Sequence, residues 1–464
     1  MNSVLRKLPI GIQTFEDIRR DNYLYVDKTA FVWRIANTGK PYFLSRPRRF
    51  GKSLLLSTFE AYFKGKKELF EGLAIEQMEK EWRQFPVLHL DLNAKKYETP
   101  EDLNAMLNQH LEKWESQYGD EKKDRSPEER FSYVISRASE QAGCGVVVLV
   151  DEYDKPLLQT LCNIPLMEEY RQTLKAFYGV LKSSDRYLRF VFLTGVTKFA
   201  QVSVFSDLNQ LNDISMKPQY ATICGITMQE LTHTFAPEIQ QLAEHNGLTQ
   251  EEALQKMKVS YDGYHFCKNS PVDIFNPFSL LNALADKELK NYWAASGATS
   301  LLPKFVSDME IQLEHFDHCY IDRDTLETSD VSDGGTELFL YQSGYLTIKD
   351  YDEGVYTLGI PNFEVRKALY KIVVPALTLK TKAQAITTQN ILLKMMQDGN
   401  LDEAKKALKA LIADVPYSNK KLASMDMEER YRLIINTIFN AIGFKVEVEK
   451  QISTGRIDMV VFTR

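Results

Sequence analysis

The stretch PYFLSRPRRFGKSLLL, residues 41–56, decides the fold of this chain. Its apolar start predicts a short strand, its centre a compact basic turn, and its Gly-Lys-Ser end the beginning of an apolar helix. This order is typical of a phosphate-binding loop, in which successive backbone N–H groups surround an anion. Lys52 would reach the outer phosphates and the Ser53 hydroxyl would be a ligand for Mg²⁺. The usual pattern has glycine where this chain has Arg46, so the loop geometry stays open.

Seven consecutive residues of the turn and the helix start are expected to contact the nucleotide, because free N–H groups gather there. They are Arg48, Arg49, Phe50, Gly51, Lys52, Ser53 and Leu54. The arginines at 46, 48 and 49 could add charge at the phosphates, hold the loop in place, or contact nucleic acid. We expect a structural role for at least one of them.

Length and composition indicate an ordinary globular chain of several domains. At 464 residues, a prior of roughly 150 residues per domain predicts about three domains. Hydrophobic residues (44%) and charged residues (26%) occur in the proportions of a chain that buries a core. The net charge of -6 argues against a generally basic nucleic-acid-binding protein, although a local basic groove stays compatible with it.

Cysteine usage and the N-terminal sequence predict a soluble, cytoplasmic chain without a membrane partner. The five cysteines are scattered and form no C-x-x-C pair, which argues against a disulfide framework. The first nine residues lack the apolar segment of a signal peptide. No apolar run reaches the roughly 20 residues that cross a bilayer. The oligomeric state stays open.

Apolar runs that alternate with helical patterns predict an α/β fold. Beyond the loop strand we expect four further strands, at residues 85–92, 145–150, 188–195 and 220–226. The unbroken valines after residue 145 are typical of a strand that is covered on both faces. Five strands separated by helices favour a right-handed, doubly wound parallel sheet.

Capping patterns predict where several of the intervening helices begin. Helix starts are expected at Thr99, Ser126 and Thr227, where a capping hydroxyl is followed by acids in the first turn. Asp27 is expected to cap a helix that carries Phe31 and Ile35 on its apolar side.

A change of pattern near residue 261 predicts the domain organisation. Residues 1–258 form the expected nucleotide-binding domain, and residues 259–384 form a mostly helical middle domain with a hairpin near residues 344–358. Residues 385–464 contain a helical connector, then a helix and two strands.

Three polar residues at strand ends complete the predicted nucleotide site. Asp151 ends the valine strand and, from a neighbouring parallel strand, would hold Mg²⁺ opposite Ser53. Glu152 would orient or deprotonate the attacking water, and Thr194 would position that water or sense the γ-phosphate. With an extra strand at residues 86–92 between the loop and the acid strand, the pattern matches the additional-strand, catalytic-glutamate class of P-loop ATPases. ATP and Mg²⁺ are the expected cofactors.

Less specific signals suggest further contacts. Arg186, Arg189 and Lys198 flank the strand that ends in Thr194, and each is a candidate for neutralising transition-state charge. The adenine could stack on Tyr25 or pack near Phe31, although core packing is the competing interpretation for both aromatics.

Five motifs resemble the bacterial AAA-ATPase-like family. They are YVDKT (25–29), RPRRFGKS (46–53), VDEYDKP (150–156), FLTG (192–195) and YDGY (261–264). The resemblance spans nearly the whole chain and implies that Arg46 in place of glycine is normal for this group. It also implies that residues 1–258 are an AAA-like P-loop ATPase domain. Residues 205–209 and 211–215 would belong to it, near the γ-phosphate.

The resemblance further implies a PD-(D/E)xK nuclease-like domain at the C-terminus. The GRID motif at residues 455–458 is similar to that of the family and makes Asp458 the expected metal aspartate. The Glu-x-Lys strand of a complete site would come after Phe462, but the sequence stops at Arg464. We therefore expect a partial nuclease-like segment, without nuclease activity in the chain as given.

The leading hypothesis is a Mg²⁺-dependent ATPase coupled to a nuclease-like module that acts on, or is regulated by, DNA or RNA. A nucleotide-dependent switch or scaffold with little turnover is the alternative. A third hypothesis, a complete nuclease with a regulatory ATPase, requires the missing Glu-x-Lys.

Overall fold

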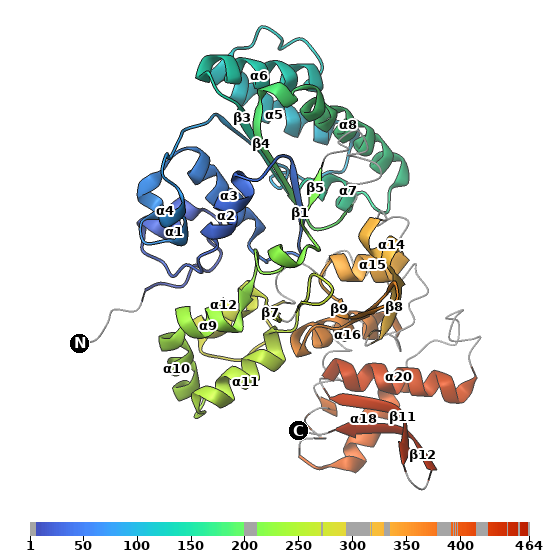
Figure 1. Cartoon of the computed structure of the whole chain (residues 1–464). Coiled ribbons are helices and arrows are strands. Elements are labelled where there is room, and N and C mark those ends of the chain that lie inside the picture. The colour runs from blue at the N-terminus through green and yellow to red at the C-terminus, as the bar shows by residue number, and fades with distance from the viewer. Residues whose placement is uncertain are drawn as a thin grey trace.

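The computed structural model describes residues 6–198, 211–270, 272–293, 316, 318–328, 335–377, 391–392, 394, 396, 398–413, 426–442, 444–452 and 455–462. Among these residues, a five-stranded sheet with the order β2-β3-β4-β1-β5 organises the first half of the chain (Figure 1). Its strands are β1 (Tyr42–Ser45), β2 (Val87–Asp91), β3 (Val146–Asp151), β4 (Leu188–Gly195) and β5 (Asn212–Asp213). Each neighbouring pair is parallel, which confirms the expected α/β fold with a parallel sheet.

Burial along the strands explains their sequence patterns. Every residue of β1 and β3 is buried, as expected for strands covered on both faces. β2 lies at one edge of the sheet, and its residues alternate between half-buried and buried. The continuous valine run of β3 therefore reflects an inner position in the sheet, and the alternating pattern of β2 reflects an edge position.

Helices cover the sheet in two groups (Figure 1). The first group packs together around the helix that follows the loop: α1 (Phe15–Arg20), α2 (Thr29–Ala36), α3 (Lys52–Phe63) and α4 (Ala74–Met78). The second group consists of α5 (Pro100–Tyr118), α6 (Pro127–Ala142) and α8 (Ile164–Ser183), with the short α7 (Lys155–Gln159) packed on α8. Both groups contribute to the main hydrophobic core.

The fifth strand is not where the sequence pattern predicts it. The sheet ends with β5, whereas residues 220–226 contain a turn and only the first residue of β6 (Ile226–Thr227). β6 pairs antiparallel with β7 (Ile274–Phe275), outside the large sheet. Ile223 and Cys224 are buried, so their apolar character reflects core packing. Gly225 turns the chain at φ +88°, where a Cβ would lie 2.3 Å from Ile274.

The order of the strands corrects a second expectation. The acid strand β3 is not a direct neighbour of the loop strand β1, because β4 lies between them. Residues 86–92 supply the edge strand β2. The strand that ends in Thr194 is thus the one that separates the loop from Asp151.

The predicted helix starts agree with the structure, with one small shift. Thr99, Ser126 and Thr227 cap α5, α6 and α9 (Met228–Thr234), each through a reciprocal capping box. Asp27 lies one residue before the cap of α2, and its Oδ1 accepts hydrogen bonds from the amide and the hydroxyl of Thr29 at 2.8 and 2.6 Å.

A further hydrophobic core lies beside the loop. It unites α9, α10 (Ala236–His245), α11 (Gln250–Tyr261) and α12 (Pro277–Asp286) with Leu24 from the N-terminal part. α11 runs across residue 258, where the sequence predicts the end of the first domain. The division into three domains stays a prediction.

The rest of the described chain contains two small antiparallel sheets. In the first, β8 (Cys319–Asp322), β9 (Thr347–Asp352) and β10 (Val355–Gly359) have the order β8-β10-β9, which includes the predicted hairpin. Around them lie α14 (Arg323–Thr328), α15 (Gly335–Gln342) and α16 (Phe363–Leu377). The chain continues with α18 (Leu401–Ala413), α20 (Met427–Ile442), β11 (Lys445–Ile452) and β12 (Gly455–Phe462). α20 packs on α16, and β11 pairs antiparallel with β12, as the helix–strand–strand pattern predicts.

Candidate functional site

The loop between β1 and α3 curls through two left-handed residues. These are Arg49, with φ +70°, and Gly51, with φ +91°, which caps α3. A non-glycine residue with positive φ is uncommon and marks a loop whose conformation is imposed by its surroundings. Arg46 does not have a positive φ, so the position where glycine is usual makes no demand for one in this chain.

The Arg46 side chain anchors the loop to the segment at residues 215–220. Arg46 is 2% exposed, and its guanidinium donates hydrogen bonds to the carbonyl oxygens of Ser45 (2.9 Å), Ser215 (2.7 Å) and Tyr220 (3.2 Å). The same group lies 4.2 Å from the ring centroid of Phe266. These contacts give Arg46 the structural role that we expect for at least one of the three arginines.

The remaining loop residues differ in what they present to solvent. Phe50 is buried, with its ring edge-on to Tyr264 (4.9 Å between centroids) and Phe266 (5.3 Å). Arg49 is exposed and lies over the ring of Phe278, 4.9 Å from its centroid. Thus Phe50 belongs to the core, and only its backbone is left for an anion.

Lys52 begins α3 and is almost fully buried. Its ammonium donates to the carbonyl oxygens of Arg46 (2.9 Å) and Pro47 (3.2 Å), and 5% of the residue is exposed. Ser53 and Leu54 follow on α3 and are both partly buried. The lysine therefore folds back over the loop that it follows.

Asp151, Glu152 and Thr194 meet at the carboxyl edge of the sheet. β3 and β4 are adjacent, and Thr194 Oγ1 donates a 3.0 Å hydrogen bond to Asp151 Oδ1. The Glu152 amide donates to the same oxygen at 3.0 Å, and Glu152 itself is left-handed, with φ +49°. Parallel pairing explains why residues 43 positions apart lie in contact.

The pKa of Glu152 depends on burial and on charges from both the loop and the strand ends. Burial raises the pKa of Glu152 above its usual range, the nearby charge of Lys52 lowers it, and Asp151 raises it further. Lys52 and Glu152 therefore lie close enough to influence each other across β4. A half-buried carboxylate beside a lysine, at the end of a parallel strand, is a reasonable place for acid–base chemistry.

A narrow apolar cavity opens beside the start of α3. Gly51 and Leu54 line it together with Tyr25, and Cys224 and Leu281 come from the segments that cover it. Tyr25, one of the two candidate aromatics for the adenine, therefore borders a space next to the loop. Phe31 does not line this cavity and packs on Tyr220, with 6.4 Å between ring centroids.

Comparison with known proteins identifies the family. Residues 9–205 match a family model described as "Predicted AAA-ATPase". Over 464 aligned residues the chain is 34% identical to an "Uncharacterized protein in vnfD 5'region" of Azotobacter chroococcum mcd 1, covering 98% of this chain and 87% of that protein. The chain belongs to the AAA-ATPase-like family. Membership supports a nucleotide-binding protein, and no helix among the residues described is long and apolar enough to cross a membrane.

Among the other residues predicted for this site, Arg186 and Arg189 lie away from it. Arg186 and Arg189 are at the amino end of β4, whereas Thr194 is near its carboxyl end, so neither arginine is placed to reach the site. Lys198 is buried and pairs with Asp213 at 3.1 Å. Residues 205–209 lie outside the described residues. Asp458 is in β12, and its side chain is not described.

Two residues of the VDEYDKP motif have no predicted role, although they lie beside the candidate site. Asp154 and Lys155 follow Asp151 and Glu152 on the same turn, and a run of four charged residues around one tyrosine was the available signal. Lys155 Nζ donates to the side-chain oxygen of Asn93 at 2.5 Å and so links the turn to the segment after β2. Asp154 binds the end of β4, as described below.

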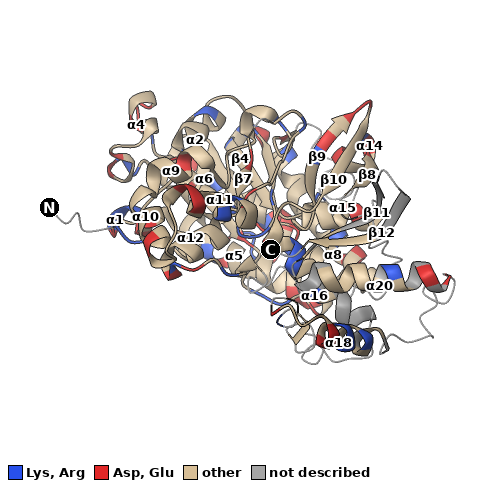
Figure 2. Ribbon diagram, turned by 90° about the horizontal axis from the view of Figure 1, so that it is seen from below, with Lys and Arg blue, Asp and Glu red and all other residues tan. Residues whose placement is uncertain are grey.

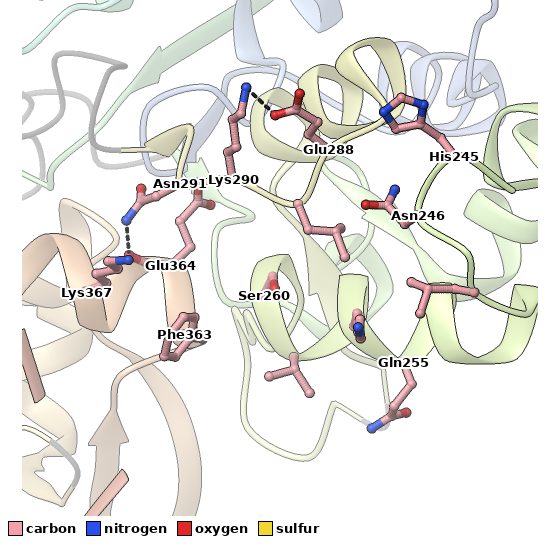
Figure 3. A pocket seen from close by; sticks show the side chains of 14 residues that line it. His245, Asn246, Gln255, Ser260, Glu288, Lys290, Asn291, Phe363, Glu364 and Lys367 are labelled. Carbon is pink, nitrogen blue, oxygen red and sulfur yellow. Dashed lines mark hydrogen bonds and ion pairs between the residues drawn. The ribbon is translucent and has the colours of Figure 1, made fainter. Parts of the chain in front are cut away.

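The AAA-ATPase-like chain has a second, larger cavity of about 1120 Å³ between α10, α11 and the start of α16 (Figure 3). Asn291, Glu364 and Lys367 border one side, and His245 and Gln255 border the other. None of its lining residues belongs to the loop or to the strand ends. Burial raises the pKa of Glu364 to about 7, although the Tyr292 and Trp293 amides that donate to its carboxylate oppose the shift.

Proposed function

We propose that this chain binds ATP with Mg²⁺ at the loop and hydrolyses it at the carboxyl edge of the parallel sheet. The observation that carries the proposal is the Thr194–Asp151 hydrogen bond, which joins the ends of β4 and β3 beside β1, the strand that leads into the loop and Lys52. Family membership supports nucleotide binding, and the order of the strands is compatible with the additional-strand class of P-loop ATPases, with β4 as the added strand.

Each residue of the proposed site has a defined task. The backbone N–H groups from Arg48 to Leu54, which include the first turn of α3, would surround the phosphates. Lys52 would exchange its two carbonyl partners for the outer phosphates. Glu152 would accept a proton from the attacking water, and Thr194 would hold that water or the γ-phosphate.

The oxygen donors present fit Mg²⁺. The Ser53 hydroxyl and the Asp151 carboxylate are hard oxygen ligands of the kind that Mg²⁺ prefers. Within the described residues, no group of three His, Cys, Asp or Glu side chains converges to hold a metal. The ion would therefore enter with the nucleotide, whose phosphates supply further ligands and whose charge it offsets.

The apolar cavity beside α3 would hold the base. Its walls, among them Tyr25, Leu54 and Leu281, offer a flat heterocycle burial. Lys28 also borders the cavity, but its ammonium is engaged by the Thr222 carbonyl (2.7 Å) and by Glu230 (2.5 Å). Recognition would then rest on shape and on backbone groups.

Two substitutions test the proposal. Lys52→Ala should weaken Mg-ATP binding by about tenfold or more, which corresponds to about 1.4 kcal/mol. Glu152→Gln should retain binding and lower kcat by about 100-fold or more, as for the loss of a general base. Lys64→Ala, at the exposed residue that follows the last turn of α3, is the matched control. Equal rates in the wild type and both variants would contradict the assignment.

A slow nucleotide-dependent switch is the second candidate. One observation favours it: Lys52 is already held by two loop carbonyls, which ATP must displace. A chain with stoichiometric bound nucleotide and negligible turnover would support the switch over the ATPase.

We further propose the three-domain organisation at residues 1–258, 259–384 and 385–464, a cytoplasmic location, and coupling to the C-terminal module. The helix and two strands of that module, α20 with β11 and β12, are compatible with the start of a nuclease-like domain. Figure 2 shows basic and acidic residues interspersed along the described elements rather than gathered on one of them. Stimulation of ATP turnover by added DNA or RNA would support coupling to nucleic acid, and its absence would count against it.

A further inference from the structure

We propose that Asp154 is a positioning residue that holds the end of β4, and so places the Thr194 hydroxyl on Asp151. This inference rests on the proposed ATPase function and adds a residue to its machinery that acts through another residue.

Asp154 is a buried carboxylate with an unusual concentration of donors. Its Oδ2 accepts hydrogen bonds from the amides of Val196 (2.9 Å) and Thr197 (2.6 Å) and from the Thr197 hydroxyl (2.6 Å). Asp154 is 1% exposed and Thr197 is fully buried. Hydrogen bonds in a buried place are stronger than those exposed to water.

These three bonds fix the backbone immediately after Thr194. The preceding residue of the turn adds two more, since the Tyr153 amide donates to the Thr194 carbonyl (3.1 Å) and the Tyr153 hydroxyl donates to the Thr197 carbonyl (2.8 Å). Gly195 makes this approach possible, because a Cβ there would lie 2.6 Å from an Asp154 carboxylate oxygen. The turn after β3 is thus bonded along the whole end of β4.

The arrangement has a direct consequence for Thr194. Its hydroxyl reaches Asp151 at 3.0 Å only while the end of β4 keeps its place beside the turn that carries Asp151 and Glu152. On the other side, the Lys198 amide donates to the Gln342 side chain at 3.1 Å, which ties the next residue to α15. Asp154 is therefore the side chain that, together with Tyr153, links the acid turn to the strand end that carries Thr194.

The test compares Thr197→Val, which removes one donor and keeps the side-chain shape, with Thr197→Ser, which keeps the donor. For Mg-ATP hydrolysis we expect Thr197→Val to lower kcat by about tenfold with KM within about twofold, and Thr197→Ser to remain close to the wild type. Asp154→Asn should change kcat in the same direction. Should Asp154→Asn fail to fold, the matched Val and Ser pair decides alone.

Non-additivity separates positioning from general loss of structure. In a Thr194→Ala background, Thr197→Val should lower kcat no further, because the hydroxyl that it positions is gone. Additive losses, or normal kcat in Thr197→Val, would overturn the inference and leave the ATPase assignment intact. Asp262→Asn, at another buried aspartate (2% exposed), is the control and should retain wild-type kcat. An inactive wild-type chain would contradict the proposed function and this inference together.

Discussion

Arg46 is the residue at which this loop departs from the usual phosphate-binding pattern. The departure does not require a strained backbone, because the left-handed residues of the loop are Arg49 and Gly51. A glycine at position 46 could not supply the guanidinium that binds the Ser215 and Tyr220 carbonyls. The loop of this chain is therefore held in place by a buried cation beneath it.

Arg46→Met should destabilise the fold. The substitution keeps a long apolar stem but removes the guanidinium that donates to the buried carbonyl oxygens of Ser45, Ser215 and Tyr220, although the Tyr220 carbonyl keeps the Ile223 amide as a donor (3.2 Å). We therefore expect a loss of about 3 kcal/mol in the free energy of unfolding. Urea unfolding provides the measurement. Arg83→Met, at an exposed arginine, is the control and should change stability by less than about 0.5 kcal/mol. Equal stability of the two variants would show that the Arg46 contacts contribute little.

The kcat of the proposed ATPase reaction should fall at acid pH as Glu152 becomes protonated. A general base works when it is deprotonated, and burial raises the pKa of Glu152. As the pH falls through this raised pKa, kcat should fall, with a midpoint above the ordinary glutamate value of 4.5. A kcat profile at saturating Mg-ATP measures it, and the residual rate of Glu152→Gln should lack this decrease. A midpoint at or below the ordinary value would argue for another base.

At the scale of elements, the cavity beside α3 makes a prediction about affinity. Leu281 on α12 lines the cavity but lies outside the loop, so Leu281→Gln should weaken ATP binding by about tenfold, which corresponds to about 1.4 kcal/mol. Binding of inorganic tripolyphosphate, which has no base, should be unchanged. Calorimetry with both ligands is the measurement, and Leu254→Gln, in the same helical core but away from the cavity, is the control. Equal weakening of both ligands would place the base elsewhere.

Strand and helix patterns predict much of the sheet, and the reasons for the misses are physical. Long buried strands such as β3 and β4 have continuous apolar runs, and Thr99 and Ser126 mark helix starts through local hydrogen bonds. β5 has two partly buried residues, too few for any periodicity to appear. The apolar run at residues 220–226 reports burial between two cores, which sequence alone does not distinguish from a strand.

The candidate site shows the same limit. Lys52, Asp151 and Glu152 are recognisable because motif residues cluster in sequence, and their catalytic roles stay predictions. The neighbourhood of Asp154 and Thr197 depends on β4 lying beside β3, a fact of strand order. Arg186 and Arg189 are close to Thr194 in sequence, which suggests a role in the site. They lie at the amino end of β4, whereas Thr194 is near its carboxyl end.

At the scale of the whole molecule, Glu364 should make stability depend on pH. Its pKa is raised from 4.5 to about 7 by burial, so the folded chain binds a proton that the unfolded chain releases between these values. The associated stability, up to about 3 kcal/mol, is present below pH 4.5, is lost as the pH rises toward 7, and is absent above it.

Glu364→Gln should flatten this dependence, because the amide does not ionise. Urea unfolding at pH 5 and pH 8 measures the slope, and Glu288→Gln, on the exposed rim of the same cavity, is the control. An identical slope in the wild type and Glu364→Gln would mean that other groups set the pH response.

The contacts of the loop with distant segments have a consequence for how this protein can be divided. The family match ends at residue 205, but the loop makes contacts beyond it. Arg46 donates to the carbonyl oxygens of Ser215 and Tyr220, and Phe50 packs on Tyr264 and Phe266. Pro47 lies so close to Gly344 that a Cβ on residue 344 would be 2.7 Å from the Pro47 side chain. A fragment that ends at residue 205 would lack β5, the strand beside β1, and would expose the side of Phe50 that packs on Tyr264 and Phe266. The phosphate-binding loop therefore depends on segments outside residues 9–205 for its conformation. Recombination that exchanged residues 9–205 between relatives would have to carry the compatible partners at 215–278 and 344 with it.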